Sequence, residues 1–231
     1  MPSQPASPRS LRPLGKPLAR AFFERPPEQV APRLLGKLLV RTSEAGTTLA
    51  GRIVEVEAYL GPHNEPPDPA AHAHRGPTPR NQVLFGPPGH AYVYSIYGQY
   101  FCMNISCEPA GRAGCVLLRA LEPVAGVQEM ALNRGLTPGA PHRALTSGPS
   151  RLCQALGLSR SAHNGLDLLA PRSPLQVRDD GFVVPECVLT PRIGIRHAVD
   201  RLLRFSLPGH SCVSAARARP GSALGERVFL G

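Results

Sequence analysis

One stretch of the sequence decides how the rest must fold: Gly51-Arg-Ile-Val-Glu-Val-Glu-Ala-Tyr59. Its residues alternate in kind, and successive side chains of a β-strand point to opposite faces of a sheet. One predicted face carries Val54, Val56 and Ala58, and the other carries Ile53, Glu55, Glu57 and Tyr59. The second face, with two carboxylates, is either a solvated strand surface or a functional one.

On both sides of this strand in the sequence, turn residues separate further segments with strand-like or helix-like patterns. Strands are predicted at 37–41, 91–97, 100–106 and 114–121, and less clearly at 175–177, 192–195, 203–207 and 211–215. The pair Gly98-Gln99 suits a two-residue hairpin turn. Helices are predicted near 18–23, 26–36, 124–134 and 149–156. Because no glycine-rich phosphate loop or strand–helix alternation occurs, the pattern predicts an α+β domain on a largely antiparallel sheet.

The remaining segments set the expected boundaries of this domain. Residues 1–17 are rich in Pro and Ser without periodicity, so we expect a disordered basic arm followed by a single domain at 18–231. Residues 60–90 are dense in Gly, Pro, His and Asn, and a loop of this length in a compact domain is usually functional or disordered. Residues 135–146 are predicted to be a linker.

The charge of the chain restricts its partners. Of 231 residues, 26 are Lys or Arg and 16 are Asp or Glu, a formal net charge of +10. This balance indicates a polyanionic partner, either nucleic acid or an anionic membrane surface. No apolar run approaches the roughly 18 residues of a membrane span, and no signal peptide is visible, so a cytoplasmic protein is expected.

Lysine and cysteine usage narrows the possible chemistry. Lys16 and Lys37 are the only lysines, so Schiff-base chemistry has few candidate amines. The six cysteines form no C-x-x-C pair, and we expect reduced, mostly buried thiols.

Several residues are candidates for chemistry because of their type and position. A carboxylate beside an aromatic plane, as in Glu57 and Tyr59, can activate a water next to a stacked planar substrate. Tyr97, at the hairpin turn, can wedge into a base step or belong to a cross-strand aromatic cluster. Asn104 and Arg119 interrupt apolar strands, so each needs a partner, and Glu57 is available to Arg119.

Two loop segments carry further candidates. Asp68-Pro-Ala-Ala-His72-Ala-His74-Arg75 contains a His-x-His pair near a carboxylate, which can bind a metal, stack on a base or have no role. Ser147-Gly-Pro-Ser150-Arg151 is predicted to begin a helix, whose free N–H groups can hold a phosphate or be capped in the ordinary way. Neither segment decides between these alternatives alone.

In order and spacing, a set of segments resembles the alkyladenine (3-methyladenine) DNA glycosylase family, of the methylpurine-DNA glycosylase type. The segments are Arg52-Ile-Val-Glu-Val-Glu57-Ala-Tyr59-Leu-Gly-Pro, Thr78-Pro-Arg-Asn81, Tyr92-Val-Tyr94-Ser-Ile-Tyr97-Gly98, Asn104-Ile-Ser, Val116-Leu-Leu-Arg119-Ala-Leu-Glu-Pro123 and Ser147-Gly-Pro-Ser-Arg-Leu-Cys-Gln-Ala-Leu156. The resemblance is strong over about 20–157 and thinner through Arg192-Ile-Gly-Ile and Cys212-Val-Ser. It implies a single domain with a curved sheet, surrounding helices and a protruding β-hairpin.

The resemblance also implies a function. The protein is expected to be a monofunctional enzyme of base excision repair that flips an alkylated or deaminated purine out of duplex DNA and hydrolyses its N-glycosidic bond with an activated water. The expected substrates are 3-methyladenine, 7-methylguanine, hypoxanthine and ethenoadenine. No cofactor, metal, membrane or obligate protein partner is implied, and the expected state is a cytoplasmic monomer, nucleoid-associated in a bacterium.

The resemblance also implies roles for individual residues, at the positions of this sequence that match the family's segments. The implied catalytic groups are Glu57 as general base, with Arg119 and the Val213 carbonyl holding the water. The implied base pocket is Tyr59, His72, Tyr94 and Asn104, and the implied intercalating side chain is Tyr97. The implied contacts to the DNA backbone are Arg80, Gln99, Tyr100, Ser150, Arg151 and Arg192.

Alternatives remain at this point. Either His72 or His74 can be the stacking imidazole. A non-catalytic DNA-damage-binding protein with the same fold would keep the wedge and the basic face without turnover. A metal-dependent hydrolase would instead use His72, His74 and Glu57.

Overall fold

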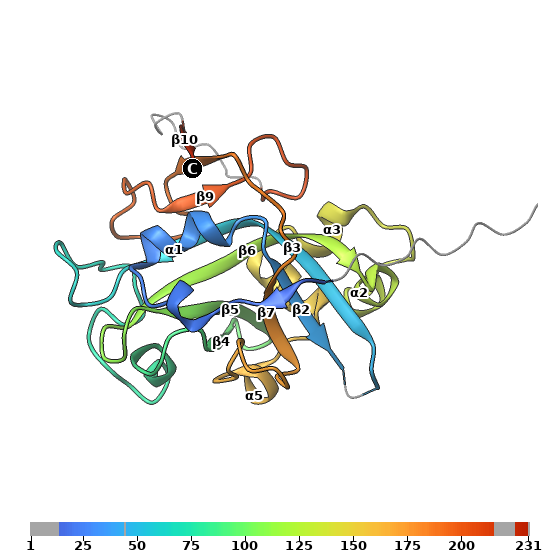
Figure 1. Ribbon diagram of the computed structural model, residues 1–231, viewed down its shortest axis with the longest axis horizontal. Helices are drawn as coiled ribbons and strands as arrows, with labels where there is room; N and C mark the ends of the chain where they lie inside the picture. The colour runs from blue at the N-terminus through green and yellow to red at the C-terminus, as the bar shows by residue number, and fades with distance from the viewer. Residues whose placement is uncertain (1–13, 44, 215–224, 231) are drawn as a thin grey trace, which may run out of the picture.

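The computed structural model describes residues 14–43, 45–214 and 225–230, and within them ten strands form one antiparallel sheet (Figure 1). The strands are β1 (Lys16–Pro17), β2 (Leu38–Thr42), β3 (Thr48–Tyr59), β4 (Ala91–Ile96), β5 (Tyr100–Cys107), β6 (Gly114–Ala125), β7 (Leu175–Asp179), β8 (Glu186–Thr190), β9 (Arg204–Ser206) and β10 (Glu226–Phe229). The helices are η1 (Arg20–Phe22), α1 (Pro27–Leu34), η2 (Gln82–Phe85), α2 (Val127–Asn133), α3 (His142–Thr146), α4 (Pro149–Ala155) and α5 (Arg160–His163). The predicted single α+β domain is confirmed.

The long strand β3 organises the sheet. The main path runs β1-β7-β2-β3-β6-β5-β4, and β9 also pairs with β3 and continues to β8 and β10. Because β6 occupies one edge of β3, the other edge is shared: β2 pairs with its first half and β9 with residues 55–57. The sheet therefore branches midway along β3, and Figure 1 shows β9 and β10 above the main path.

A β-bulge in β3 corrects the predicted alternation of its faces. Ile53 pairs with Leu121 and Glu55 pairs with Ala120, so Val54 is the extra residue. Ile53 lies in the main core with Val56, whereas Val54 packs in a separate cluster against Cys212. The prediction that Val54 shares a face with Val56 was therefore wrong, because a bulge places two successive residues opposite one.

Helices pack against this curved sheet and enclose the main core. Pro27 begins α1 with a ring already at a helical φ angle, and Val30, Ala31 and Leu34 of this helix are buried. Leu152 and Cys153 of α4 belong to the same core. All six cysteines are free and buried, as predicted.

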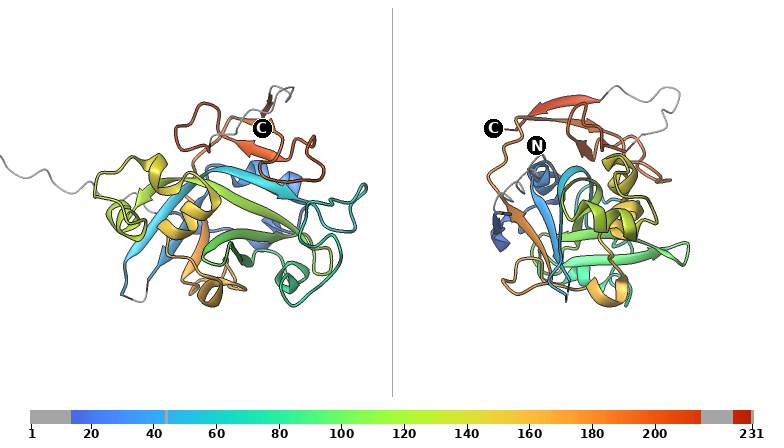
Figure 2. Two further views of the ribbon diagram at one scale, coloured as in Figure 1. Left: turned by 180° about the vertical axis from the view of Figure 1, so that it is seen from behind. Right: turned by 90° about the vertical axis from the view of Figure 1, so that its right-hand side faces the viewer.

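The β4–β5 hairpin projects from the body of the molecule in the right-hand view of Figure 2. Ile96 pairs with Tyr100, so the turn contains three residues rather than the predicted two-residue Gly98-Gln99 turn. Tyr97 and Gly98 both have positive φ angles, 49° and 76°. Glycine tolerates this conformation freely, whereas tyrosine does not.

Several predicted elements differ from the observed ones. Residues 192–195 and 211–214 contain no strand, and the predicted linker at 135–146 contains α3. Sequence patterns missed β8, β10 and α5. Most of the expected arm, 1–13, lies outside the described residues, and Lys16 and Pro17 at its end pair with β7. Among the described residues, no helix is long and apolar enough to cross a membrane.

Candidate active site

Glu57 lies on the polar face of β3 and is fully buried. Its Oε1 accepts the Ile193 N–H at 2.7 Å and lies 3.1 Å from Nη1 of Arg119. Its Oε2 accepts the Tyr59 hydroxyl at 2.9 Å. Since each carboxylate oxygen has two lone-pair sites, Oε2 keeps the capacity to accept one further hydrogen bond.

Tyr59 keeps its proton in this arrangement. Burial, followed by the negative charge of Glu57, raises the pKa of Tyr59 far above its ordinary value. The hydroxyl therefore donates to Glu57 throughout the physiological pH range and orients the carboxylate.

Arg119, on the adjacent strand β6, bridges two carboxylates of β3. Its Nε donates to Oε1 of Glu55 at 2.9 Å, while its Nη1 faces Glu57. Burial alone would lower the pKa of Arg119. The negative charges of Glu57 and Glu55 outweigh burial, so the pKa of Arg119 is raised above its ordinary value. The guanidinium therefore stays charged in the interior.

Glu55 is the anchor of this arrangement, a role that the sequence did not reveal. It also accepts from Nε of Arg204 at 2.7 Å and from the hydroxyl and N–H of Ser214 at 2.7 and 2.6 Å. Burial raises the pKa of Glu55, yet Arg119, Arg204 and Ser214 together lower it below its ordinary value. The presence of two carboxylates on one strand face was the only sequence signal for this residue.

A cavity of about 400 Å³ opens beside these groups, within the range of small-molecule sites. Its lining comes from four strands, the start of α4 and two loops. The residues that line it include Tyr59, Pro69, Ala70, His72, Tyr94, Asn104, Leu117, Arg119, Pro149, Ile193, Gly194, Ile195, Arg196 and His197. The predicted pocket residues Tyr59, His72, Tyr94 and Asn104 are thus brought together.

Aromatic rings form one wall of the cavity. The His72 ring contacts Tyr94 edge-on at 4.5 Å between centroids, and its Nδ1 lies 3.0 Å from the Tyr92 hydroxyl. Burial, followed by the Arg80 cation, lowers the pKa of His72, so the imidazole is neutral at pH 7. His74 is not among the lining residues, which favours His72 as the stacking imidazole.

Asn104 and Val213 occupy different places relative to the cavity. Asn104 is buried in the lining, and its Oδ1 faces the Cys115 thiol at 3.6 Å. Val213 is not among the lining residues, and its N–H donates to the His210 carbonyl. It directly precedes Ser214, which binds Glu55, so it lies next to the charged cluster.

Tyr97 is 90% exposed at the tip of the hairpin, which excludes the core-cluster alternative. Of the expected contacts to the DNA backbone, Arg80, Gln99, Tyr100 and Arg151 are exposed, and Ser150 is half-buried in the first turn of α4.

Arg192 is placed differently from the expectation. Its side chain is fully buried and forms two hydrogen bonds with Asp68, at 2.5 and 2.8 Å. The guanidinium is thus enclosed where no DNA phosphate can reach it. The expected contact between Arg192 and the DNA backbone is therefore wrong.

Within the described residues, no group of three or more His, Cys, Asp or Glu side chains is arranged to hold a metal ion. His72 faces Tyr94, and Glu57 is bound by Arg119, Tyr59 and Ile193. The geometry therefore gives no support to the set His72, His74 and Glu57 as metal ligands.

Comparison with known proteins identifies the family of the chain. The model of the family described as methylpurine-DNA glycosylase (MPG) matches residues 21–211. The chain belongs to the methylpurine-DNA glycosylase family. The match spans the whole cavity lining and the hairpin, and it ends before Val213.

Relatives of this methylpurine-DNA glycosylase family member match along most of its length. A protein of Koribacter versatilis is 53% identical over 87% of this chain and 94% of its own length. A protein of Burkholderia cenocepacia is 47% identical over 89% of this chain and 94% of its own length. A protein of Nitrobacter winogradskyi is 50% identical over 87% of this chain and 88% of its own length. All three are described as candidate 3-methyladenine DNA glycosylases.

Proposed function

We propose that this protein is a monofunctional DNA glycosylase that flips alkylated or deaminated purines out of duplex DNA and hydrolyses their N-glycosidic bond. One observation carries the proposal: Glu57 is buried directly behind Tyr59, Arg119 and Ile193, which line an aromatic cavity, and an acceptor site is free on its Oε2. The proposed substrates are 3-methyladenine, 7-methylguanine, hypoxanthine and ethenoadenine, in duplex DNA, and the protein acts in the cytoplasm as a monomer.

Glu57 acts as the general base in this proposal. A water held between Oε2 of Glu57 and Arg119 attacks C1′ of the flipped nucleotide and gives its proton to Glu57. The C1′–N bond breaks, and its electron pair leaves with the base. The Val213 carbonyl, next to Ser214, is the proposed second acceptor for this water.

The cavity wall selects the base. A purine carrying a positive charge gains cation–π attraction when it stacks between Tyr59 on one side and His72 and Tyr94 on the other. The neutral state of His72 avoids charge repulsion with such a base. Asn104 is proposed to disfavour guanine through its exocyclic amine.

The placement of both lysines supports hydrolysis without strand cleavage. Lys37 is bound to Asp179 at 2.7 Å, and Lys16 lies in β1, paired with β7. Neither residue lines the cavity. A Schiff base between enzyme and sugar therefore has no lysine donor at the site.

A single-turnover assay tests the proposed function. Duplexes carrying one 3-methyladenine analogue, ethenoadenine or hypoxanthine are incubated with excess protein and EDTA, then analysed with and without alkali. Strand breaks that appear only after alkali are the expected result. Breaks without alkali would contradict the monofunctional mechanism, and loss of activity in EDTA would favour a metal-dependent hydrolase.

Glu57→Gln is the matched control for this assay. The amide keeps the size of the side chain and an acceptor for the Ile193 N–H, but it cannot take a proton. We expect excision to fall by roughly 10²–10⁴-fold, the usual contribution of a general base, with lesion binding retained. Equal excision by both proteins would contradict the base assignment, and tight binding without excision by the wild type would identify a non-catalytic damage-binding protein.

A further inference from the structure

Two loops, 60–72 and 191–203, close one side of the cavity. The first carries His72, and the second carries the lining residues 193–197. Neither loop contains a helix or a strand, so their positions depend on contacts with β3 and with each other. One such contact lies near the surface, where Nη2 of Arg201 donates to the Pro67 carbonyl at 3.0 Å.

A buried contact between the loops is the pair of Arg192 and Asp68. Both side chains are fully inaccessible, and the two hydrogen bonds between them make a bidentate contact. Asp68 also accepts the N–H groups of Leu60 and Ala70 at 3.2 Å each. The carboxylate therefore fixes the first loop on either side of itself, immediately before His72.

Arg192 makes further contacts with the strand that carries the proposed base. Nη1 donates to the Ala58 carbonyl at 3.0 Å, and the guanidinium lies 4.5 Å from the centre of the Tyr59 ring. Arg192 does not line the cavity, whereas Tyr59 does. The guanidinium thus stacks on Tyr59 from the protein interior and supports the ring that faces the ligand.

The residue after Arg192 connects this pair to Glu57. The Ile193 N–H donates to Oε1 of Glu57, so the position of the Arg192 backbone sets the position of that donor. One buried side chain therefore controls three features of the site: the Tyr59 ring, the loop before His72 and a hydrogen bond to Glu57.

We propose that the Arg192–Asp68 pair is a positioning device for excision, which holds Tyr59, His72 and the Glu57 hydrogen bond in reactive geometry. This inference rests on the proposed function. Asp68 balances the charge of Arg192, so the pair supports the stacking ring without presenting a net positive charge to a cationic base. A displacement of about 1 Å in such positioning groups costs up to 10²-fold in rate.

The variant Arg192→Lys tests the proposal. Lysine keeps the charge but is a point donor, so it cannot both form the bidentate contact and stack as a plane on Tyr59. We expect the single-turnover excision rate at saturating enzyme to fall roughly 10–100-fold, the cost of misplaced reacting groups.

The chain provides a matched control in Arg52. Its guanidinium also makes a bidentate contact, with Asp180 at 3.0 and 2.8 Å, and also stacks on an aromatic ring, that of Phe182, at 4.2 Å. None of these residues lines the cavity. Arg52→Lys removes the same kind of interaction, so it should lower the melting temperature and leave the excision rate unchanged.

A spectroscopic measurement separates positioning from stability. Ethenoadenine fluoresces, and stacking on aromatic rings quenches it. In a Glu57→Gln background, bound ethenoadenine should be less quenched when Arg192→Lys is added, and should not change when Arg52→Lys is added. If Arg192→Lys does not fold, Asp68→Asn, which keeps the shape of the side chain, takes its place in every measurement.

The outcomes distinguish the two proposals. No excision by the wild-type protein would overturn the proposed function. The positioning role would be overturned if the wild type excises the base and the two variants, Arg192→Lys and Arg52→Lys, show equal excision rates and equal quenching. That result would leave the proposed function intact.

Discussion

Glu55 and Glu57 face the same side of β3, yet their surroundings give them different chemistry. Glu55 accepts from Arg119, Arg204 and Ser214, and its Oε1 alone has three donors. Glu57 has fewer donors and an acceptor site free on Oε2. Two buried arginines and Ser214 hold Glu55 in place, whereas Glu57 contacts Tyr59, Arg119 and Ile193, which line the cavity, so Glu55 is suited to anchoring and Glu57 to the proposed proton transfer.

Arg196 leads to a prediction about lesion preference. It lines the cavity with an exposed cationic side chain, which disfavours a positively charged base relative to a neutral one. Arg196→Ala should therefore raise the excision rate of a cationic 7-methylguanine relative to neutral hypoxanthine, by a few-fold because solvent screens the charge. Single-turnover rates on the two duplexes give the ratio, and an unchanged ratio would contradict the idea. Arg172→Ala, which removes an exposed arginine outside the cavity lining, is the control.

At the scale of elements, the β4–β5 hairpin presents a strained and exposed tyrosine. The φ angle of Tyr97, 49°, costs a residue with a Cβ roughly 1–2 kcal/mol. Tyr97→Gly relieves this strain, so it should stabilise the fold slightly while it weakens lesion binding and excision. Thermal unfolding and excision are measured on the same variant, so loss of activity cannot be attributed to unfolding.

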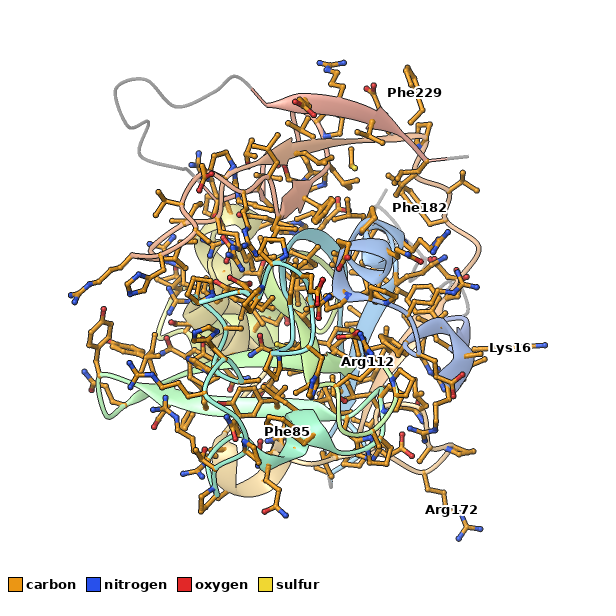
Figure 3. The ribbon with its side chains drawn as sticks, turned by 90° about the vertical axis from the view of Figure 1, so that its left-hand side faces the viewer. Lys16, Phe85, Arg112, Arg172, Phe182 and Phe229 are labelled. Carbon is orange, nitrogen blue, oxygen red and sulfur yellow. The ribbon has the colours of Figure 1, made fainter. Side chains whose placement is uncertain are left out.

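An exposed aromatic residue elsewhere provides the control for this prediction. Phe229 is 80% exposed on β10, and Figure 3 shows it pointing outward at the top of the molecule, away from the hairpin. Phe229→Gly should leave excision unchanged. Unchanged excision by Tyr97→Gly as well would contradict intercalation by the hairpin tip.

The elements also explain which parts of the molecule the sequence could predict. Alternation identified β3, and the polar residues of the pocket followed from the resemblance of their segments. The bulge at Val54 was not predictable, because pairing with β6 and β9 creates it. The segments at 192–195 and 211–214 read as strands, yet the N–H groups of Ile193 and Ser214 donate to Glu57 and Glu55 instead of to a neighbouring strand. Local patterns do not show that a distant carboxylate is the acceptor.

At the scale of the whole molecule, the net charge of +10 predicts a salt-dependent affinity for DNA. Several arginines are neutralised inside the protein, so the exposed ones carry this effect. Arg151 is one of these exposed arginines, in the first turn of α4 and two residues after Pro149 of the cavity lining.

The dependence of DNA affinity on salt concentration, measured as the slope of log K against log salt, tests the role of these exposed arginines. Arg151→Ala should weaken binding to undamaged and damaged duplexes alike and reduce the slope of log K against log salt by about 1, the effect of one lost phosphate contact. Arg172, which Figure 3 shows at the lower end of the molecule, is the control, and Arg172→Ala should leave the slope unchanged. A flat salt dependence for the wild-type protein would contradict binding through phosphates.

The division of labour between sheet and loops has an evolutionary consequence. Glu57 and Arg119 belong to paired strands, while much of the cavity lining belongs to the two loops joined by Arg192 and Asp68. Substitutions at 194–197 can therefore alter which lesions are accepted without disturbing the reacting groups. Under the proposed function, a few loop substitutions are expected to change the range of substrates while Glu57 and Arg119 keep their positions.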